Sequence, residues 1–413
     1  MGKTWNNNIL RKINPRIDRQ LRLSVLRGRP HSIVISQKIN AQICDAQSTK
    51  NIITICNQNL NGLNSCNIAT ALHRTAQKYE AILNKTANDP LIASKVESKE
   101  VFNMLRKPVL YQLKNSLFNP KELSNVAWAL ATLGIIDREI FEAIGKRTID
   151  SIRNFNEHDL SITAYAFARV GIRDTSLFEE IARESIKKID SFIDQDLALI
   201  VWSFAVMQID KKRLFETFSA EIMKKLGVVM DEHCLMIAWS YAAIDRMEMI
   251  NRPEFFEKIN AKTKFSDKQL SQLYEILVYI KACRPSLKLL MSESVINAAK
   301  TFMRVKSSNK PRPPISQNQL SSALNQVDFN HLNEYFCAGY FMDCANTYER
   351  INVEMDGDIY HYASDGQLLG NCILRDRILK AMGWKVIRIK MSKWNELRGM
   401  EERKAFLRKL LPK

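Results

Sequence analysis

The segment FNPKELSNVAWALATLG, residues 118–134, decides the fold, because its first six letters return at regular intervals. Similar hexamers are FNEHDL at 155, FIDQDL at 192, MDEHCL at 230 and FSDKQL at 265. The steps between them are 37, 37, 38 and 35 residues. A period in this range predicts an α-solenoid, in which each repeat buries its apolar face only against its neighbours.

A large aromatic residue follows each hexamer at a fixed place. These aromatic positions are Trp128, Tyr165, Trp202, Trp239 and Tyr274. Alanines recur three residues further on, at 131, 168, 205 and 242, with small residues one helical turn before each of them. Small faces of this kind let stacked helices approach closely. The aromatic rings either pack between hairpins or offer a surface on which unpaired bases stack, and the sequence leaves both interpretations open.

A second helix is expected in each repeat. It is marked by Phe141, Phe178, Phe215 and Phe256, and Asp137, Asp174 and Asp210 precede it as N-caps. The stretch CNIATALHRTA at 66–76 matches the first-helix pattern, with Thr70 in the aromatic position, and predicts a divergent extra unit. We therefore expect an array of helical hairpins over residues 45–303.

The charge of the chain indicates a polyanionic partner. Lys and Arg number 61 against 44 Asp and Glu in 413 residues, a formal net charge of +17. The first 44 residues hold nine Lys and Arg and one acid, Asp18. This segment is either a mitochondrial or plastid targeting sequence or a basic arm that touches RNA phosphates. No run of about 18 apolar residues predicts a membrane span.

The periodicity changes after residue 303. Residues 304–320 are polar, basic and Pro-rich, which is typical of a linker. From 321 to 413 we expect a small α/β domain of order β-β-α-β-α. Its first strand lies in EYFCAGYFMDCAN, its second is INVEMDG, its helix is CILRDRILKAMG and its last strand is WKVIRIK.

These residues carry a resemblance. The pattern YFMDCAN, INVEMDG, LLGNCILRDRILKAMGWKVIRIKMSKWNEL and AFLRKLL resembles a RAP domain, the C-terminal module of many organellar RNA-binding proteins. The positions that match are Gly370, Leu379, Gly383, Trp384, Val386, Ile389, Trp394 and Leu397. The preceding repeats are similar in period and order to octotricopeptide-like and heptatricopeptide-like arrays and to those of the FAST kinase family.

The RAP domain is itself similar to restriction-endonuclease-like folds, which implies a candidate catalytic site. In such nucleases, acids on adjacent strands bind Mg²⁺, which activates a water. Here Asp343, Glu354 and Asp356 would be the metal ligands and catalytic acids, and His361 would carry protons or contact a phosphate. The alternative is that the three acids are inherited scaffold, paired with local cations and without a cofactor.

The resemblance and the charge together predict an RNA-binding protein for processing, stabilisation or ribosome assembly of organellar RNA. The expected partners are ribosomal or messenger RNA and ribosomal proteins, in the mitochondrion or, as the alternative, the plastid. A Mg²⁺-dependent RNA endonuclease is the rival function, and a protein-binding scaffold is a third. The cations expected to contact RNA are Arg169, Arg173, Lys211, Arg375, Arg377, Lys385, Arg388, Lys390 and Lys393.

Overall fold

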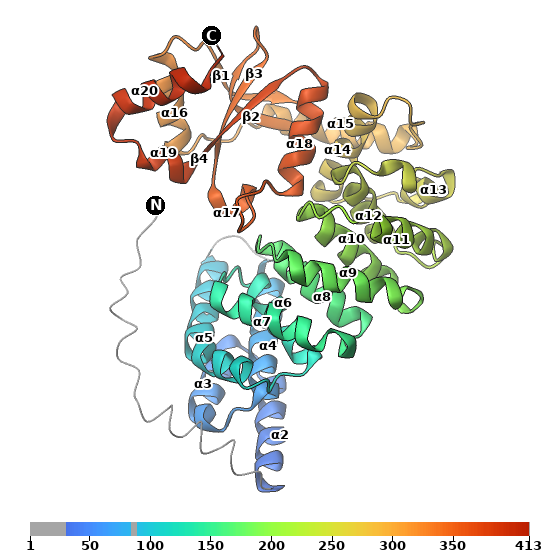
Figure 1. The fold of residues 1–413 in the computed structure, drawn as a ribbon, viewed down its shortest axis with the longest axis vertical. Coiled ribbons are helices and arrows are strands. Elements are labelled where there is room, and N and C mark those ends of the chain that lie inside the picture. Colours follow the sequence, from blue (N-terminus) through green and yellow to red (C-terminus); the bar gives the residue numbers. More distant parts are fainter. Residues whose placement is uncertain (1–29, 84–88, 413) are drawn as a thin grey trace. The chain divides into compact units, whose positions relative to one another are not determined.

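The computed structural model describes residues 30–83 and 89–412 (Figure 1). The chain divides into two compact units, residues 1–166 and 167–413. Residues 1–29, which make up most of the predicted arm or targeting segment, lie outside the described residues. None of the helices in the described ranges is long and apolar enough to cross a membrane.

The first unit is entirely helical where it is described. Its elements are α2 (Pro30–Asp45), α3 (Thr49–Asn59), η2 (Leu60–Gly62), α4 (Ser65–Leu83), α5 (Asp89–Lys114), α6 (Pro120–Thr132), α7 (Arg138–Ser151) and η3 (Ile152–Asn154). Helix α8 (Glu157–Arg169) runs across the boundary between the units. Helix α4 packs against α6, so the stretch at 66–76 occupies the place of a first helix, as its sequence predicts.

The second unit continues the helical array and then changes to a sheet. Its array elements are α9 (Thr175–Lys187), η4 (Ile189–Ser191), α10 (Asp194–Val206), α11 (Lys212–Lys224), α12 (Asp231–Ala243), η5 (Met247–Met249), α13 (Pro253–Ala261), α14 (Asp267–Cys283) and α15 (Glu293–Ser308). Within this unit α10 packs against α12, and α12 against α14. The helical array that the repeats predict is thus followed by the small α/β domain that the sequence predicts after it.

The helix starts refine the repeat register. Asn119 and Ser266 cap α6 and α14 in full capping boxes, and Asn156 accepts a hydrogen bond from the amide of Asp159. The N-caps of α10 and α12 are Ile193 and Met230, which give steps of 37, 37, 37 and 36 residues. The hexamer at 230 is therefore read one residue late from the sequence: the buried Val229 stands where the other repeats have Phe.

The caps of the second helices are predicted correctly in two of three cases. Asp137 and Asp174 accept hydrogen bonds from the third residue of α7 and α9. Asp210 does not cap α11, because the N-cap there is Lys211. The Asp210 carboxylate instead accepts two hydrogen bonds, both 2.7 Å long, from Arg246 in the next repeat. The prediction for Asp210 is wrong because an inter-repeat ion pair takes the carboxylate away from the helix start.

Helices extend into the segment expected to be a linker. Helix α15 ends at Ser308, and α16 (Ile315–Asn325) begins after Pro314, so only residues 309–314 connect them. Helix α16 packs on the C-terminal sheet and belongs to that domain by its contacts.

The C-terminal sheet has four strands in the order β1-β2-β3-β4. The strands are β1 (Leu332–Cys337), β2 (Tyr340–Asn346), β3 (Ile351–Asp356) and β4 (Lys385–Lys390). The first two pairings are antiparallel and β3 pairs parallel with β4. The single first strand expected in EYFCAGYFMDCAN is wrong: it is a hairpin that turns at Ala338 and Gly339, with φ of 55° and 91°. Positive φ at both turn residues matches the twist of an antiparallel pair.

The two faces of this sheet are covered differently (Figure 1). Helices α16, α19 (Met391–Glu396) and α20 (Gly399–Leu410) bury an apolar core against β3 and β4. Helix α18 (Gly370–Ala381), which follows the short α17 (Asp358–His361), covers the other face and also contacts α10, α12 and α14 of the array. It therefore lies between the sheet and the repeats of the second unit.

Candidate functional site

The predicted catalytic acids lie in the C-terminal domain on and beside β3. Glu354 and Asp356 alternate with the apolar Val353 and Met355, so they face α18 rather than the apolar core. Asp343 lies on β2, at the point where the β2–β3 pairing ends with Cys344 opposite Val353. Its side-chain Oδ2 accepts the Met355 amide at 2.7 Å and replaces a strand-to-strand backbone hydrogen bond.

Glu354 is held by the helix above it. Its Oε1 accepts hydrogen bonds from the Arg375 guanidinium of α18 and, at 2.6 Å, from Asn352 on the same strand face. Arg375 also donates to the carbonyl of Phe341 and lies over the Tyr340 ring at 5.4 Å. The Glu354 carboxylate is thus buried and neutralised by a fixed cation.

Asp356 is held still more tightly. It is 1% exposed and accepts hydrogen bonds at 2.8 and 3.0 Å from Arg388, which also binds Asp376 of α18. The hydroxyl of Tyr362 donates a further bond of 2.9 Å to Asp356. His361 stands at the edge of this group, with Nε2 3.8 Å from Asp356 and Nδ1 2.9 Å from the carbonyl oxygen of Gly357.

Of the three predicted acids, Asp343 alone forms no ion pair with a cation among the described residues. Its burial, and then the charge of Glu354, raise its pKa to about 8, so the carboxyl carries a proton at neutral pH. Glu334 of β1 adds a smaller repulsion, and Gln317 of α16 donates to both the Glu334 carboxylate and the Asp343 carbonyl. A protonated Asp343 beside an ionised Glu354 avoids the repulsion between two buried negative charges.

This donor set does not fit a divalent metal as it stands. Two of the three carboxylates are paired with arginines, which a metal would have to displace. Among the described residues, no group of three or more His, Cys, Asp and Glu side chains is placed to hold a metal ion. The geometry favours an internal ion-pair network over a coordination site, and no catalytic step is derived from it.

The cations predicted to contact RNA fall into several structural groups. Arg375 and Arg388 belong to the network under α18. Arg377 donates to the carbonyls of Ala242 and Ala243 at the end of α12. Arg173 pairs with Asp365 at 3.0 Å. These four arginines make contacts inside the second unit, a role that the sequence analysis missed.

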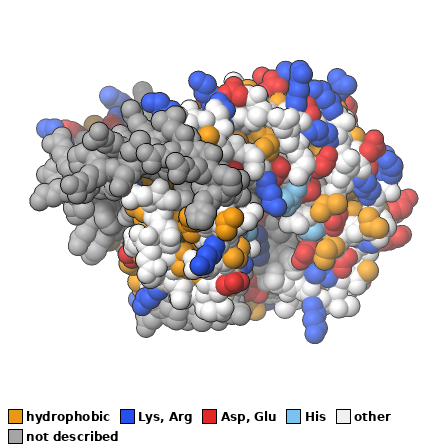
Figure 2. All heavy atoms as spheres, turned by 90° about the horizontal axis from the view of Figure 1, so that it is seen from below, with side chains coloured by type: hydrophobic (Ala, Val, Ile, Leu, Met, Phe, Trp, Pro, Cys, Tyr) orange, Lys and Arg blue, Asp and Glu red, His pale blue; other side chains and the backbone are white. Residues whose placement is uncertain are grey.

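The remaining predicted cations lie nearer to solvent. Lys211 pairs with Glu179 and Lys393 with Glu396, each at 2.7 Å. Lys390 lies 4.0 Å from the centroid of the Tyr362 ring. Arg169 and Lys385 are exposed. On the face drawn in Figure 2, Lys and Arg are interspersed with Asp and Glu, so the charge of +17 is not collected into one patch there.

The aromatic positions differ from one repeat to another. Trp239 is 6% exposed and donates from Nε1 to Glu275 at 2.8 Å. Tyr274 packs against Gly339 in the hairpin turn of the sheet domain, where an added Cβ would lie 2.9 Å from its ring. Trp128 in the first unit is half-buried and contacts the ring of His73. The interpretation as core packing between hairpins therefore holds for Trp239, whereas Tyr274 packs on the sheet domain and Trp128 remains half-buried.

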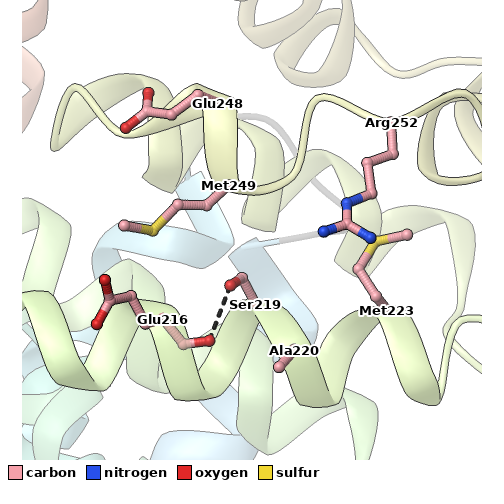
Figure 3. Close-up of a pocket in the computed structure, with 7 residues that line it drawn as sticks. All are labelled: Glu216, Ser219, Ala220, Met223, Glu248, Met249 and Arg252. Carbon is pink, nitrogen blue, oxygen red and sulfur yellow. Dashed lines mark hydrogen bonds between the residues drawn. The ribbon is translucent and has the colours of Figure 1, made fainter.

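A pocket opens between α11 and the η5–α13 segment (Figure 3). Met223 and Met249 contribute apolar surface, while Glu216 and Glu248 bring carboxylates and Arg252 one cation. Two acids against one cation disfavour a polyanion, so this pocket is not a candidate for RNA.

The helical array and the α/β domain together define a RAP-domain protein with helical repeats. A family model described as the RAP domain matches residues 353–410. A second, described as RNA-editing substrate-binding complex 6 protein, matches residues 42–268, more than half of the chain. The chain belongs to this second family and carries a RAP domain at its C-terminal side.

A curated relative supports the same assignment over a shorter stretch. The chain is 25% identical over 174 residues to a chloroplastic RAP domain-containing protein of Oryza sativa subsp. japonica. The match covers 39% of this chain and 27% of the relative, so the chain spans about a quarter of the length of that protein.

Proposed function

We propose that this protein binds single-stranded organellar RNA through its helical array and RAP domain, for processing, stabilisation or ribosome assembly. The observation that carries the proposal is the membership of a +17 chain in a family described by RNA-editing substrate binding, together with its RAP domain. The charge supplies the sequence-independent attraction to phosphates, and the array supplies a surface for unpaired bases.

The organelle is part of the proposal. The printed name of the curated relative places that protein in the chloroplast, and the basic first 44 residues resemble an organellar targeting segment. We propose the mitochondrion, with the plastid as the alternative, and ribosomal or messenger RNA, with ribosomal proteins nearby, as partners.

Cross-linking in cells followed by sequencing of the bound RNA tests the proposal directly. We expect organellar transcripts to be enriched over nuclear ones. In solution, the affinity for an unstructured RNA oligomer should fall steeply as salt rises, because bound phosphates release counterions. Nuclear transcripts alone in the cross-linked pool, or an affinity that ignores salt, would refute the proposal.

Metal-dependent cutting of RNA is the second candidate, and the protonated Asp343 beside Glu354 is the observation that favours it. Mg²⁺ would have to replace both that proton and Arg375. The test compares wild type with Glu354→Gln, which keeps the shape and removes the charge, in the presence of Mg²⁺ or Mn²⁺. Cutting by wild type that Glu354→Gln abolishes would establish the nuclease. Equal inactivity of both proteins with intact binding would leave RNA binding as the function.

A further inference from the structure

The aromatic positions are covered in one part of the second unit. Trp239 is buried and donates a hydrogen bond to Glu275, and Tyr274 lies against the hairpin turn of the RAP domain. Burial, and then the charge of Glu275, raise the pKa of Tyr340 on that hairpin, which places the RAP domain directly over this part of the array. Trp239 is thus closed to bases by its burial, and the hairpin turn covers part of the Tyr274 ring.

The first unit presents a different arrangement at the same repeat position. Trp128 of α6 lies with its ring centroid 4.8 Å from that of His73 on α4, at an interplanar angle of 42°. His73 is one turn after Thr70, which stands in the aromatic position of the divergent unit. The ring that Thr70 lacks is thus supplied from the next turn, and both rings are half-buried rather than enclosed.

Two cations, Arg74 on α4 and Lys121 on α6, act on this pair of rings. Arg74 follows His73, and its guanidinium bonds to neutral oxygens, Cys44 O at 2.6 Å and Gln77 Oε1 at 3.1 Å. Lys121 is exposed two turns before Trp128 on the same helix face, and its ammonium has no paired carboxylate within residues 30–83 and 89–412. Burial, and then the charges of Arg74 and Lys121, lower the pKa of His73, so the field of both cations acts on the imidazole ring.

A third cation reinforces the positive field. Lys78 is one turn beyond Arg74 on α4, and its pKa is lowered by burial and then by the charge of Arg74. The neighbouring acid, Glu122, is engaged by the amide of Asn119 in the capping box of α6. Arg74 and Lys78 repel one another, and the charges of Arg74 and Lys121 act on His73, so phosphate is the partner that best balances the charge of this site.

We infer that Trp128 and His73 form a stacking platform for one unpaired base of single-stranded RNA. Arg74 and Lys121 bind the phosphates on either side of that base. Stacking is available to any base, and the cations read only the backbone, so the site holds the strand without selecting a letter. The inference rests on the proposed function and names the place in the first unit where the RNA is held.

The test uses the full chain and two matched pairs of variants. Lys121→Glu reverses an exposed charge at the platform, and Lys268→Glu reverses an exposed lysine at the same place in the first turn of α14. Trp128→Leu removes the stacking ring, and Trp239→Leu removes a ring that is buried inside the array. The probe is an unstructured, fluorescently labelled uridine 12-mer, with anisotropy read over a series of salt concentrations.

We expect Lys121→Glu and Trp128→Leu each to weaken binding roughly 5- to 100-fold. Lys121→Glu should also lower the magnitude of the salt slope by about 0.7 or more. Both control variants should bind within about 2-fold of wild type, and ultraviolet irradiation should cross-link the oligomer to a peptide that contains His73 or Trp128. If Trp128→Leu loses its helical circular dichroism, the comparison of Lys121→Glu with Lys268→Glu tests the platform instead.

The failures are distinguishable. A wild-type chain that binds no RNA would refute the proposed function and this inference with it. A wild-type chain that binds RNA while all four variants lose affinity equally, or not at all, would overturn the platform and leave RNA binding in place. Displacement of the oligomer by a poly-glutamate peptide at equal charge concentration would assign the site to an acidic protein instead.

Discussion

On one face of the C-terminal sheet, Ile351, Val353 and Met355 of β3 pack against α16, α19 and α20. On the other face, their neighbours Asn352, Glu354 and Asp356 lie under α18 among arginines. All six residues are buried, so solvent is excluded from both faces. The same strand therefore buries an apolar surface on one side and a set of ion pairs on the other.

The two faces differ in how burial affects stability: it favours the apolar side chains and costs free energy for the carboxylates. Each apolar side chain on the first face contributes by leaving water. Each carboxylate on the second face costs desolvation energy that its arginine must offset. Such a network survives when every partner is present, and it is disrupted when one is lost. The following changes test that difference, beginning with the largest expected effect.

Arg388→Ala should cost the most, about 3–5 kcal/mol in the opening free energy of β3 and β4, because it leaves Asp356 and Asp376 buried without their cation. Hydrogen exchange of the strand amides in the full chain measures that energy. Lys385→Ala, an exposed cation of the same strand, is the control and should change it by less than about 0.5 kcal/mol. Equal effects of the two variants would mean that the network contributes nothing specific.

Leu407→Ala on α20 tests the apolar face. The side chain is fully buried in the core that contains Val353 and Trp394, so its removal leaves a cavity and should cost about 2–4 kcal/mol. Leu332→Ala, which is 52% exposed on β1, is the matched control and should cost little. The same exchange measurement applies. A loss for Leu407→Ala larger than that for Arg388→Ala would reverse the order that the comparison predicts.

Gly370→Ala tests how α18 closes the charged face. A Cβ there would lie 2.2 Å from the carbonyl oxygen of Ala205, so the start of α18 must move away from α10, at a cost of about 1–3 kcal/mol. Gly357→Ala has nothing within 4 Å of its added Cβ and serves as the control. Limited proteolysis of the α17–α18 segment should accelerate in Gly370→Ala alone. Unchanged cleavage would show that the array does not hold α18 in place.

The comparison also shows how far the sequence could lead. The array is predictable because one period repeats over five units, and the RAP domain because its matching positions are spread over most of the domain. The hairpin at Ala338 and Gly339 escapes detection, because a turn of two residues leaves the alternation of period two unbroken. Arg375 and Arg388 are visible only as charges. Their acidic partners become apparent once β3, β4 and α18 are placed together, and this is why surface cations were expected where internal ion pairs occur.

For the proposed RNA platform, the residues were visible in the sequence, but their contact with one another was not. The match of residues 66–76 to a first helix put Thr70 in the aromatic position, and the adjacent His73 and Arg74 were part of the quoted stretch. Only the packing of α4 against α6 brings His73 to Trp128. A search one turn beyond each aromatic position would have found it.

Asp343→Asn should change the stability of the sheet domain with the opposite sign, and only above about pH 4. The folded protein keeps the Asp343 proton up to a pKa of about 8, whereas the unfolded chain releases it near the ordinary value of 3.8. Between these values the unfolded state binds fewer protons, so the free energy of unfolding falls as pH rises from about 4 to 8 and then levels off.

Asn accepts the Met355 amide through its side-chain oxygen and has no proton to lose. The variant should therefore match wild type near pH 4 and become progressively more stable than wild type as pH rises toward 8. Exchange of the Met355 amide across this range measures the difference, with Asp358→Asn, which changes the exposed first residue of α17, as the control. A wild-type stability that rises with pH over the same window would mean that Asp343 is ionised in the folded protein. The charged face of the sheet would then hold a buried carboxylate that no arginine pairs with.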